Sequence, residues 1–300
     1  MSDKNDRLSL GAVIGILAFF FIVFLMCASV VFAVVSGDTK DGAQIGVVEV
    51  KGTIVGADPV VEHIHQFSDD EMIQAILIRV DSPGGSVSAS QEIVEAIRGI
   101  KKPVVISMGD MAASGAYYVS CAGPKIYANA GTLTGSIGVI SQIMEFKDVM
   151  DFLKLKVHTI KTGDLKDAGS PYREFNEKDS KYFTDLGLEI LDQFVSHVAE
   201  ARHLDKSKVS ALATGQVWTG RQARDLGLVD EIGGMHAAIQ ALVKEAKIQG
   251  SYQLIYPKRK GDDLFYSLIE QGASDVSEHL QTEAQNWMNQ TGTFQYLYKP

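Results

Sequence analysis

The hydrophobic positions between residues 45 and 160 fall into short apolar runs separated by stretches with helical periodicity. Short runs bounded by turn residues predict strands, whereas recurrence every three or four positions predicts helices. The predicted strands cover residues 45–50, 75–80, 104–108, 125–128, 137–144 and 157–160, and the predicted helices cover 86–100 and 114–122. Strands separated by helices imply parallel β-α-β units, so the sequence predicts an α/β fold with a mostly parallel sheet.

The second half of the chain has mainly helical periodicity. Between residues 178 and 202 the apolar side chains recur on one stripe, which predicts a long amphipathic helix. Two further helices are expected at 219–226 and 235–246, followed by a late strand at 252–256. From about residue 261 the chain is polar with scattered apolar positions. We interpret this part as an amphipathic or loose tail.

The N-terminal region contains an uncharged, apolar run from Leu8 to Val35. This run exceeds the about 20 residues that a membrane-spanning helix needs. A cleaved signal peptide would have a shorter apolar core, and a lipoprotein would need a small residue before Cys27, where Met26 stands. An uncleaved signal anchor therefore fits best. The expected organisation is a short N-terminus at 1–7, an anchor at 8–35, a polar linker at 36–43, a folded domain at 44–260 and a tail at 261–300.

Charge and composition exclude some classes of function. The formal net charge is −9, which argues against nucleic acid as the main partner because phosphate binding needs a basic face. No zinc-site spacing occurs among the histidines and the two cysteines. A disulfide between Cys27 and Cys121 is not expected, because Cys27 lies inside the apolar run.

A first candidate site is the turn Asp81–Ser86, which follows a predicted buried strand and opens a predicted helix. Its proline and two glycines allow the backbone to turn sharply and expose N–H groups. Such N–H groups at the start of a helix can stabilise a developing negative charge. The same sequence also fits an ordinary strand-to-helix turn.

A second candidate is Ser114, which lies between small residues at the start of another predicted helix. The small neighbours leave room for a substrate to approach the hydroxyl. The N–H of Gly115 would lie beside that hydroxyl, in the position of an oxyanion donor. The alternative is a capping serine on a tightly packed helix of alanine and glycine.

A nucleophilic serine needs a proton acceptor, because its hydroxyl is a weak nucleophile at its ordinary pKa. None of the seven histidines has a flanking motif that marks a catalytic triad. Lysine is the alternative base. Lys166 stands in a glycine-punctuated segment, residues 161–171, that follows a predicted strand.

Taken together, these segments resemble the signal peptide peptidase A family of serine peptidases, whose fold is similar to that of Clp proteases and the crotonase superfamily. The similarity runs from about residue 45 to about residue 247. The matching motifs are Asp-Ser-Pro-Gly-Gly-Ser at 81–86, Met-Ala-Ala-Ser-Gly-Ala-Tyr-Tyr at 111–118, Thr-Gly-Ser-Ile-Gly-Val at 134–139, Lys-Thr-Gly-Asp-Leu-Lys-Asp at 161–167 and Trp-Thr-Gly-Arg-Gln-Ala at 218–223.

The resemblance implies a fold of repeated β-β-α units and a role for each of five residues. Ser114 would be the nucleophile and Lys166 the general base, with Ser136 orienting the lysine amine. Gly85 and Gly115 would donate backbone N–H groups to the oxyanion. The motif at 218–223 we interpret as a structural entry into a helix. No metal or cofactor is implied.

The resemblance also implies substrates and partners. Family members cleave remnant signal peptides left in the membrane, which suits a single-pass protein of the bacterial inner membrane with its catalytic domain outside. The serine and lysine of one site come from neighbouring protomers or halves, so this unduplicated chain is expected to form a closed homo-oligomeric ring. The alternatives are a crotonase-like acyl-CoA hydratase or hydrolase, and a catalytically inactive membrane scaffold.

Overall fold

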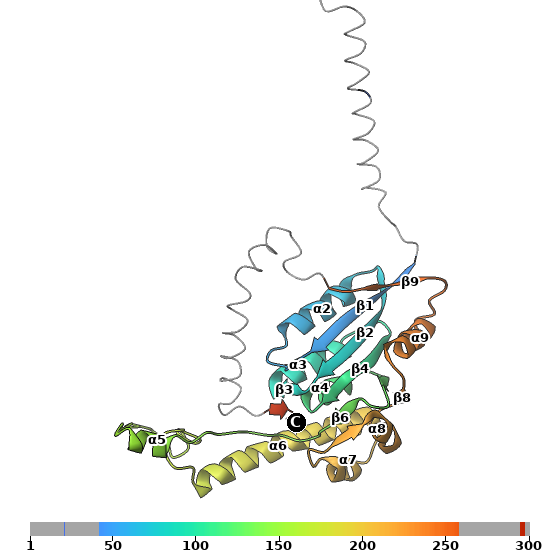
Figure 1. Ribbon diagram of the computed structural model, residues 1–300. Helices are drawn as coiled ribbons and strands as arrows, with labels where there is room; N and C mark the ends of the chain where they lie inside the picture. The colour runs from blue at the N-terminus through green and yellow to red at the C-terminus, as the bar shows by residue number, and fades with distance from the viewer. Residues whose placement is uncertain (1–20, 22–41, 258–294, 298–300) are drawn as a thin grey trace, which may run out of the picture. The chain divides into compact units, whose positions relative to one another are not determined.

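A mostly parallel sheet organises the computed structural model, which describes residues 21, 42–257 and 295–297 (Figure 1). The strand order is β7-β6-β4-β2-β1-β9, and β5 pairs with β4 and with β8. All of these pairings are parallel except that of β6 with β7. The strands of this sheet are β1 (Ala43–Lys51), β2 (Ile73–Ser82), β4 (Val104–Ala113), β5 (Ile126–Ala128), β6 (Leu133–Gly135), β7 (Val217–Thr219), β8 (Glu231–Ile232) and β9 (Tyr252–Ile255).

Helices cover the sheet, and the alternation of side chains along the strands explains why two layers form. Val48 of β1 and Ile78 of β2 face one core, whereas Val47 and Leu77 face the other. Helix α9 packs on the second face through residues such as Leu242. The helices are α2 (Asp58–Asp69), α3 (Val87–Arg98), α4 (Gly115–Ser120), α5 (Lys147–Phe152), α6 (Glu177–Arg202), α7 (Lys206–Leu212), α8 (Gly220–Leu226) and α9 (Met235–Glu245). The predicted α/β class with a mostly parallel sheet is confirmed.

A short second sheet lies beside the main one. Strand β3 (Gly84–Ser86) pairs antiparallel with β10 (Gln295–Leu297). On its other side, β3 forms an isolated parallel bridge to Ile54. Strand β3 therefore has neighbours along both of its edges.

Two strand predictions were wrong. The segment 137–144 is an extended connection beside α6 with only an isolated bridge at Ile140, and 157–160 has no regular structure. Residues 139–144 and the segment 157–160 belong to a projecting arm, residues 139–176, which leads to α6 and carries α5 at its outer end (Figure 1). Their apolar residues do not alternate between two covered faces, and Ile160 is fully exposed. An apolar run by itself does not distinguish a buried strand from such an arm.

The sequence analysis missed three helices, the short α5 and α7 and the longer α2. Helix α2 begins with proline at its first turn and buries Ile64 and Phe67 against the core. Its polar positions, among them His63 and His65, mask this narrow apolar stripe. The predicted helices at 86–100, 114–122, 178–202, 219–226 and 235–246 are all confirmed within a few residues.

The predicted anchor at 8–35 falls outside the described residues, apart from Phe21, and so does most of the predicted tail at 261–300. Among the residues that the structure describes, no helix has both the length and the apolar character needed to cross a bilayer.

Candidate functional site

Ser114 occupies a strained turn between β4 and α4. Its backbone has φ +57° and ψ −122°, a region that non-glycine residues rarely adopt and that occurs often at active sites. The side chain is buried with 1% exposure, and its hydroxyl has no hydrogen-bond partner among the residues that the structure describes. A buried hydroxyl without a partner is costly. The fold therefore holds a polar group in a position that the described part of the chain does not satisfy.

Ser136 lies next to this turn. The N–H of Ser114 donates to the carbonyl oxygen of Gly135 over 2.8 Å, and β4 pairs with β6 at Ala113 and Gly135. Ser136 also has a positive φ of +49° and is 5% exposed. Its N–H donates to the carbonyl of Gln216. The structure thus brings the two predicted serines together at the carboxyl ends of neighbouring strands.

Hydrogen bonds fix the end of β4 that leads into Ser114. The Asp81 carboxylate accepts from the N–H of Met111 over 3.1 Å. The Thr134 hydroxyl donates to the carbonyl of Ala112 over 2.7 Å. A side chain at Gly109 would collide with Asp81, since its Cβ would lie 2.6 Å from the carboxyl carbon. The sequence analysis placed Asp81 in a turn motif but did not foresee that it holds the strand leading into the candidate nucleophile Ser114.

The backbone N–H and carbonyl of Gly85 in β3 both point to the edge of this strand that faces away from Ile54. Ile54 donates to the carbonyl of Gly84 and accepts from the N–H of Ser86, so the N–H of Gly85 points to the opposite edge. That edge is where β10 pairs, with Tyr296 opposite Gly85. A Cβ at Gly85 would lie 2.0 Å from the carbonyl oxygen of Ile54. Only glycine fits this close approach.

Gly115 is the first residue of α4 and is buried. Its N–H is one of those at the start of a helix that have no acceptor within the helix. Helix α4 packs against β3, so the elements that carry Gly115 and Gly85 are neighbours. This arrangement suits two backbone donors to one oxyanion.

Lys166 is exposed and lies in the projecting arm between α5 and α6. Its backbone N–H donates to the carbonyl of Gly163. Because the Ser114 hydroxyl has no partner, the amine of Lys166 does not reach it within this chain. The predicted serine and lysine are therefore not brought together by one copy.

His197 does not form a base for Ser114 either. The residue is 6% exposed, and its Nε2 lies 2.9 Å from the carbonyl oxygen of Tyr118. Its Nδ1 lies 3.1 Å from an Arg98 nitrogen. Since Arg98 can only donate, Nδ1 accepts and Nε2 donates. Burial lowers the pKa of His197, so the neutral imidazole ties α6 to α4.

Trp218 is a partly buried side chain that the sequence analysis interpreted only as part of a helix entry. It pairs with Thr134 across β6 and β7, and its buried indole nitrogen has no hydrogen-bond partner within the described ranges. A Cβ at Gly135 would lie 2.7 Å from the indole ring. The helix entry itself is confirmed, because Thr219 and Gln222 form a capping box at the start of α8.

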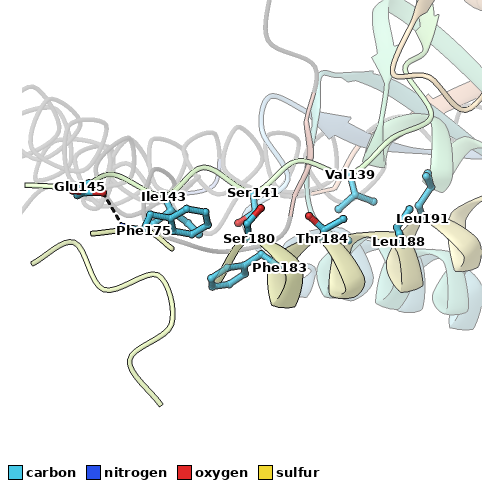
Figure 2. Close-up of a pocket in the computed structure, with 11 residues that line it drawn as sticks. Val139, Ser141, Ile143, Glu145, Phe175, Ser180, Phe183, Thr184, Leu188 and Leu191 are labelled. Atoms are coloured by element: carbon cyan, nitrogen blue, oxygen red, sulfur yellow. Dashed lines mark hydrogen bonds between the residues drawn. The ribbon is translucent and has the colours of Figure 1, made fainter. Parts of the chain in front are cut away.

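An apolar groove of about 580 Å³ runs between the arm and α6. Figure 2 shows side chains from the extended segment 139–145 facing those of α6 across it. At one end the Glu145 carboxylate accepts from the N–H of Phe175 over 2.9 Å. The lining residues are Val139, Ser141, Ile143, Glu145, Phe175, Ser180, Phe183, Thr184, Gly187, Leu188 and Leu191. Such a surface is suited to an apolar peptide or to a second copy of the chain.

Comparison with known proteins gives consistent results. The sequence model of peptidase family S49 matches residues 96–249, and that of Clp protease matches residues 48–137. A putative signal peptide peptidase SppA of Enterococcus faecium is 35% identical over 64% of this chain and 57% of its own length. Protease 4 of Haemophilus influenzae is 32% identical over 85% of this chain and 44% of its own length.

A putative protease of Synechocystis is 37% identical over 65% of this chain, and the match covers 72% of that protein. The chain spans about half the length of the first two relatives.

Proposed function

The chain belongs to peptidase family S49, and from this premise we propose that it is a serine endopeptidase with Ser114 as nucleophile and Lys166 as general base. The observation that carries the proposal is the Ser114 hydroxyl, which is buried and unpartnered on a strained turn. Strain and an unsatisfied polar group are costs that a fold retains mainly at functional sites.

The proposed chemistry uses residues of this fold alone. The Ser114 oxygen attacks the carbonyl carbon of the scissile bond while its proton passes to the neutral amine of Lys166. The N–H groups of Gly85 and Gly115 donate to the oxyanion. Lys166 then returns the proton to the leaving amine, and water, activated by the same amine, releases the acyl group from Ser114. Ser136 holds the lysine amine in the required orientation.

We propose that Lys166 acts on Ser114 of a neighbouring copy in a closed ring. The exposed position of Lys166 and the missing partner of Ser114 support this arrangement. The arm that carries Lys166 also exposes large apolar side chains, among them Phe152 at 85% and Leu155 at 52%. Contiguous exposed apolar side chains favour a protein interface. Head-to-tail contacts of one kind close into a ring when the rotation allows it.

The proposed substrates are remnant signal peptides and other unfolded peptides in the bacterial inner membrane. Two features support a peptide substrate. The edge of β3 already accepts an extended strand, β10, which is how peptides bind by strand addition. The groove along α6 is mainly apolar, as is the core of a signal peptide. A single-pass anchor at 8–35 would keep the catalytic domain on the outer side, near such substrates.

Active-site labelling combined with product mapping tests the proposal. A fluorophosphonate probe should modify Ser114 of the full chain, and a synthetic signal peptide should be cut at internal bonds. Matched full-length Ser114→Ala protein is the control. Hydration of an acyl-CoA without a Ser114 adduct would favour the crotonase-like alternative, and neither activity would favour a scaffold.

A further inference from the structure

Arg173 stands at the centre of a network of ion pairs inside the arm. Its guanidinium donates to both carboxylate oxygens of Asp167, each over 3.2 Å, and to the Asp167 carbonyl over 2.9 Å. It also donates to both carboxylate oxygens of Asp179, one of them over 2.8 Å. One arginine therefore bridges two carboxylates, with a forked geometry on each that lysine does not reproduce.

The two carboxylates belong to parts of the chain with different roles. Asp167 directly follows Lys166, the proposed base. Asp179 is the third residue of α6, is 2% exposed, and also accepts from the N–H of Asn176 in the capping box of that helix. Arg173 thus connects the loop that carries Lys166 to the fixed start of a 26-residue helix.

Other contacts complete the attachment of this loop. The Lys161 amine donates to the Asp167 carboxylate over 2.7 Å and to the carbonyl of Asp164 over 3.0 Å. Gly169 has φ +71°, and a Cβ there would lie 3.0 Å from the ring of Phe183 on α6. The part of the loop that follows Lys166 is therefore folded against α6, while Lys166 itself is exposed.

The ion pairs of Asp167 affect how strongly its carboxylate can stabilise the protonated amine of the adjacent Lys166. A free carboxylate beside a lysine stabilises the protonated amine, which is the wrong state for a base. Hydrogen bonds from Arg173, and then from Lys161, lower the pKa of Asp167 to about 2. The carboxylate is thus ionised and already bound to two cations of its own loop.

We propose that Arg173 is a positioning residue for Lys166, holding residues 163–170 on α6 so that the amine is presented to Ser114 of the neighbouring copy. This inference rests on the proposed shared site. Arg173 acts through the lysine-bearing loop and does not itself touch the substrate. A substitution of Arg173 should consequently lower activity only when it is in the subunit that supplies the lysine. Because Arg173 orders the loop before the substrate binds, its loss should lower kcat more than it raises KM.

Co-expression of two full-length variants tests this confinement. Ser114→Ala chains supply an intact lysine and Lys166→Ala chains supply an intact serine, so their mixture is the reference. Arg173→Gln placed in the Ser114→Ala chain should lower kcat by about 10–100-fold with little change in KM, as loss of a supporting residue commonly does. The same substitution in the Lys166→Ala chain should leave the mixture at the reference rate.

Two further variants separate positioning from general damage. Lys147→Gln removes another exposed ion pair of the arm, with Asp151, and should have no effect in either chain. Arg173→Lys keeps the charge without the fork and should give an intermediate kcat. Equal losses from Arg173→Gln in both chains, or no loss in either, would overturn the proposal.

The activity of the reference mixture tests the shared site separately from the role of Arg173. An inactive reference mixture would contradict the shared site alone. The single variant Arg173→Gln then decides the remaining question: a lower kcat at constant KM supports positioning of Lys166, and an unchanged kcat refutes it.

Discussion

The N–H of Ser114 donates to the carbonyl oxygen of Gly135 over 2.8 Å, which ties the candidate nucleophile to the residue that precedes Ser136. Both serines adopt positive φ angles, +57° and +49°. Two strained residues at adjacent strand ends place two hydroxyl-bearing residues side by side. The remaining proposed catalytic group, Lys166, lies in the exposed arm.

Substitutions in the proposed catalytic unit should differ in severity. Ser114→Ala and Lys166→Met should each reduce peptide cleavage by several orders of magnitude, because members of one catalytic unit fail together. Ser136→Ala should cost about 10–100-fold, since it removes an orienting bond and not the base. Initial rates with a fluorogenic peptide measure all three. Near-normal turnover by Lys166→Met would remove Lys166 from the mechanism.

Gly85→Ala should abolish activity through a backbone collision. The added Cβ would lie 2.0 Å from the carbonyl oxygen of Ile54, so β3 must shift and carry its proposed oxyanion donor with it. Gly56→Ala is the matched control, because a Cβ there meets nothing within 4 Å. Peptidase assays and thermal unfolding of both variants measure the difference. A fully active Gly85→Ala protein would contradict the assignment of Gly85.

His197 should make stability depend on pH. Burial lowers its pKa in the folded protein, so the folded state binds fewer protons than the unfolded state, whose histidine has a pKa of about 6.5. This stabilisation is complete above pH ~6.5 and is lost as the pH falls through the folded-state pKa. Between pH 7 and pH 5 the Tm of the natural protein should therefore fall.

His197→Gln is the matched comparison, because a carboxamide can donate to Tyr118 and accept from Arg98 without titrating. The Tm of this variant should fall less over the same pH range. Parallel Tm curves for the two proteins would show that His197 does not account for the loss of stability.

Tyr117 should stabilise the junction between the sheet core and the helical half. Its buried hydroxyl donates to the carbonyl of Leu228 over 2.9 Å. Tyr117→Phe leaves that carbonyl without its partner and should lower the free energy of unfolding by about 1–3 kcal/mol. Tyr252→Phe, which removes an exposed hydroxyl with a 3.4 Å contact to Gln240, should change it little. Urea denaturation compares the two variants.

The sequence predicted the parts of the fold where periodicity and burial agree. The continuous apolar runs at 45–50 and 75–80 indicated the central strands correctly, because both faces of these strands are covered: Val47 and Leu77 face one core, and their neighbours face the other. In the arm, Val157 and Ile160 are apolar but exposed, so the same reasoning gave a strand that does not exist. The pattern of apolar residues shows that a segment can be buried, but it does not show which other part of the protein covers it.

The site was predictable only in part for a similar reason. The small residues after a predicted strand indicated Ser114, whereas Ser136 came only from the family resemblance. The structure brings the two together because β4 and β6 are parallel and pair at Ala113 and Gly135. No pattern in the sequence indicated the role of Arg173. Its partners Asp167 and Asp179 lie six positions before and after it, and most of the chain that connects them has no regular structure. The catalytic roles of all five site residues and the ring stay predictions; the residues are Ser114, Ser136, Gly85, Gly115 and Lys166.

The most direct test of the shared site is the rate of peptide cleavage by co-expressed full-length Ser114→Ala and Lys166→Ala chains, compared with each variant alone. In a closed ring assembled at random from equal amounts, about a quarter of the interfaces join an intact serine to an intact lysine. The mixture should therefore recover about a quarter of the natural activity, while each variant alone remains inactive. A mixture no more active than the separate variants would show that Lys166 does not serve Ser114 of a neighbouring copy.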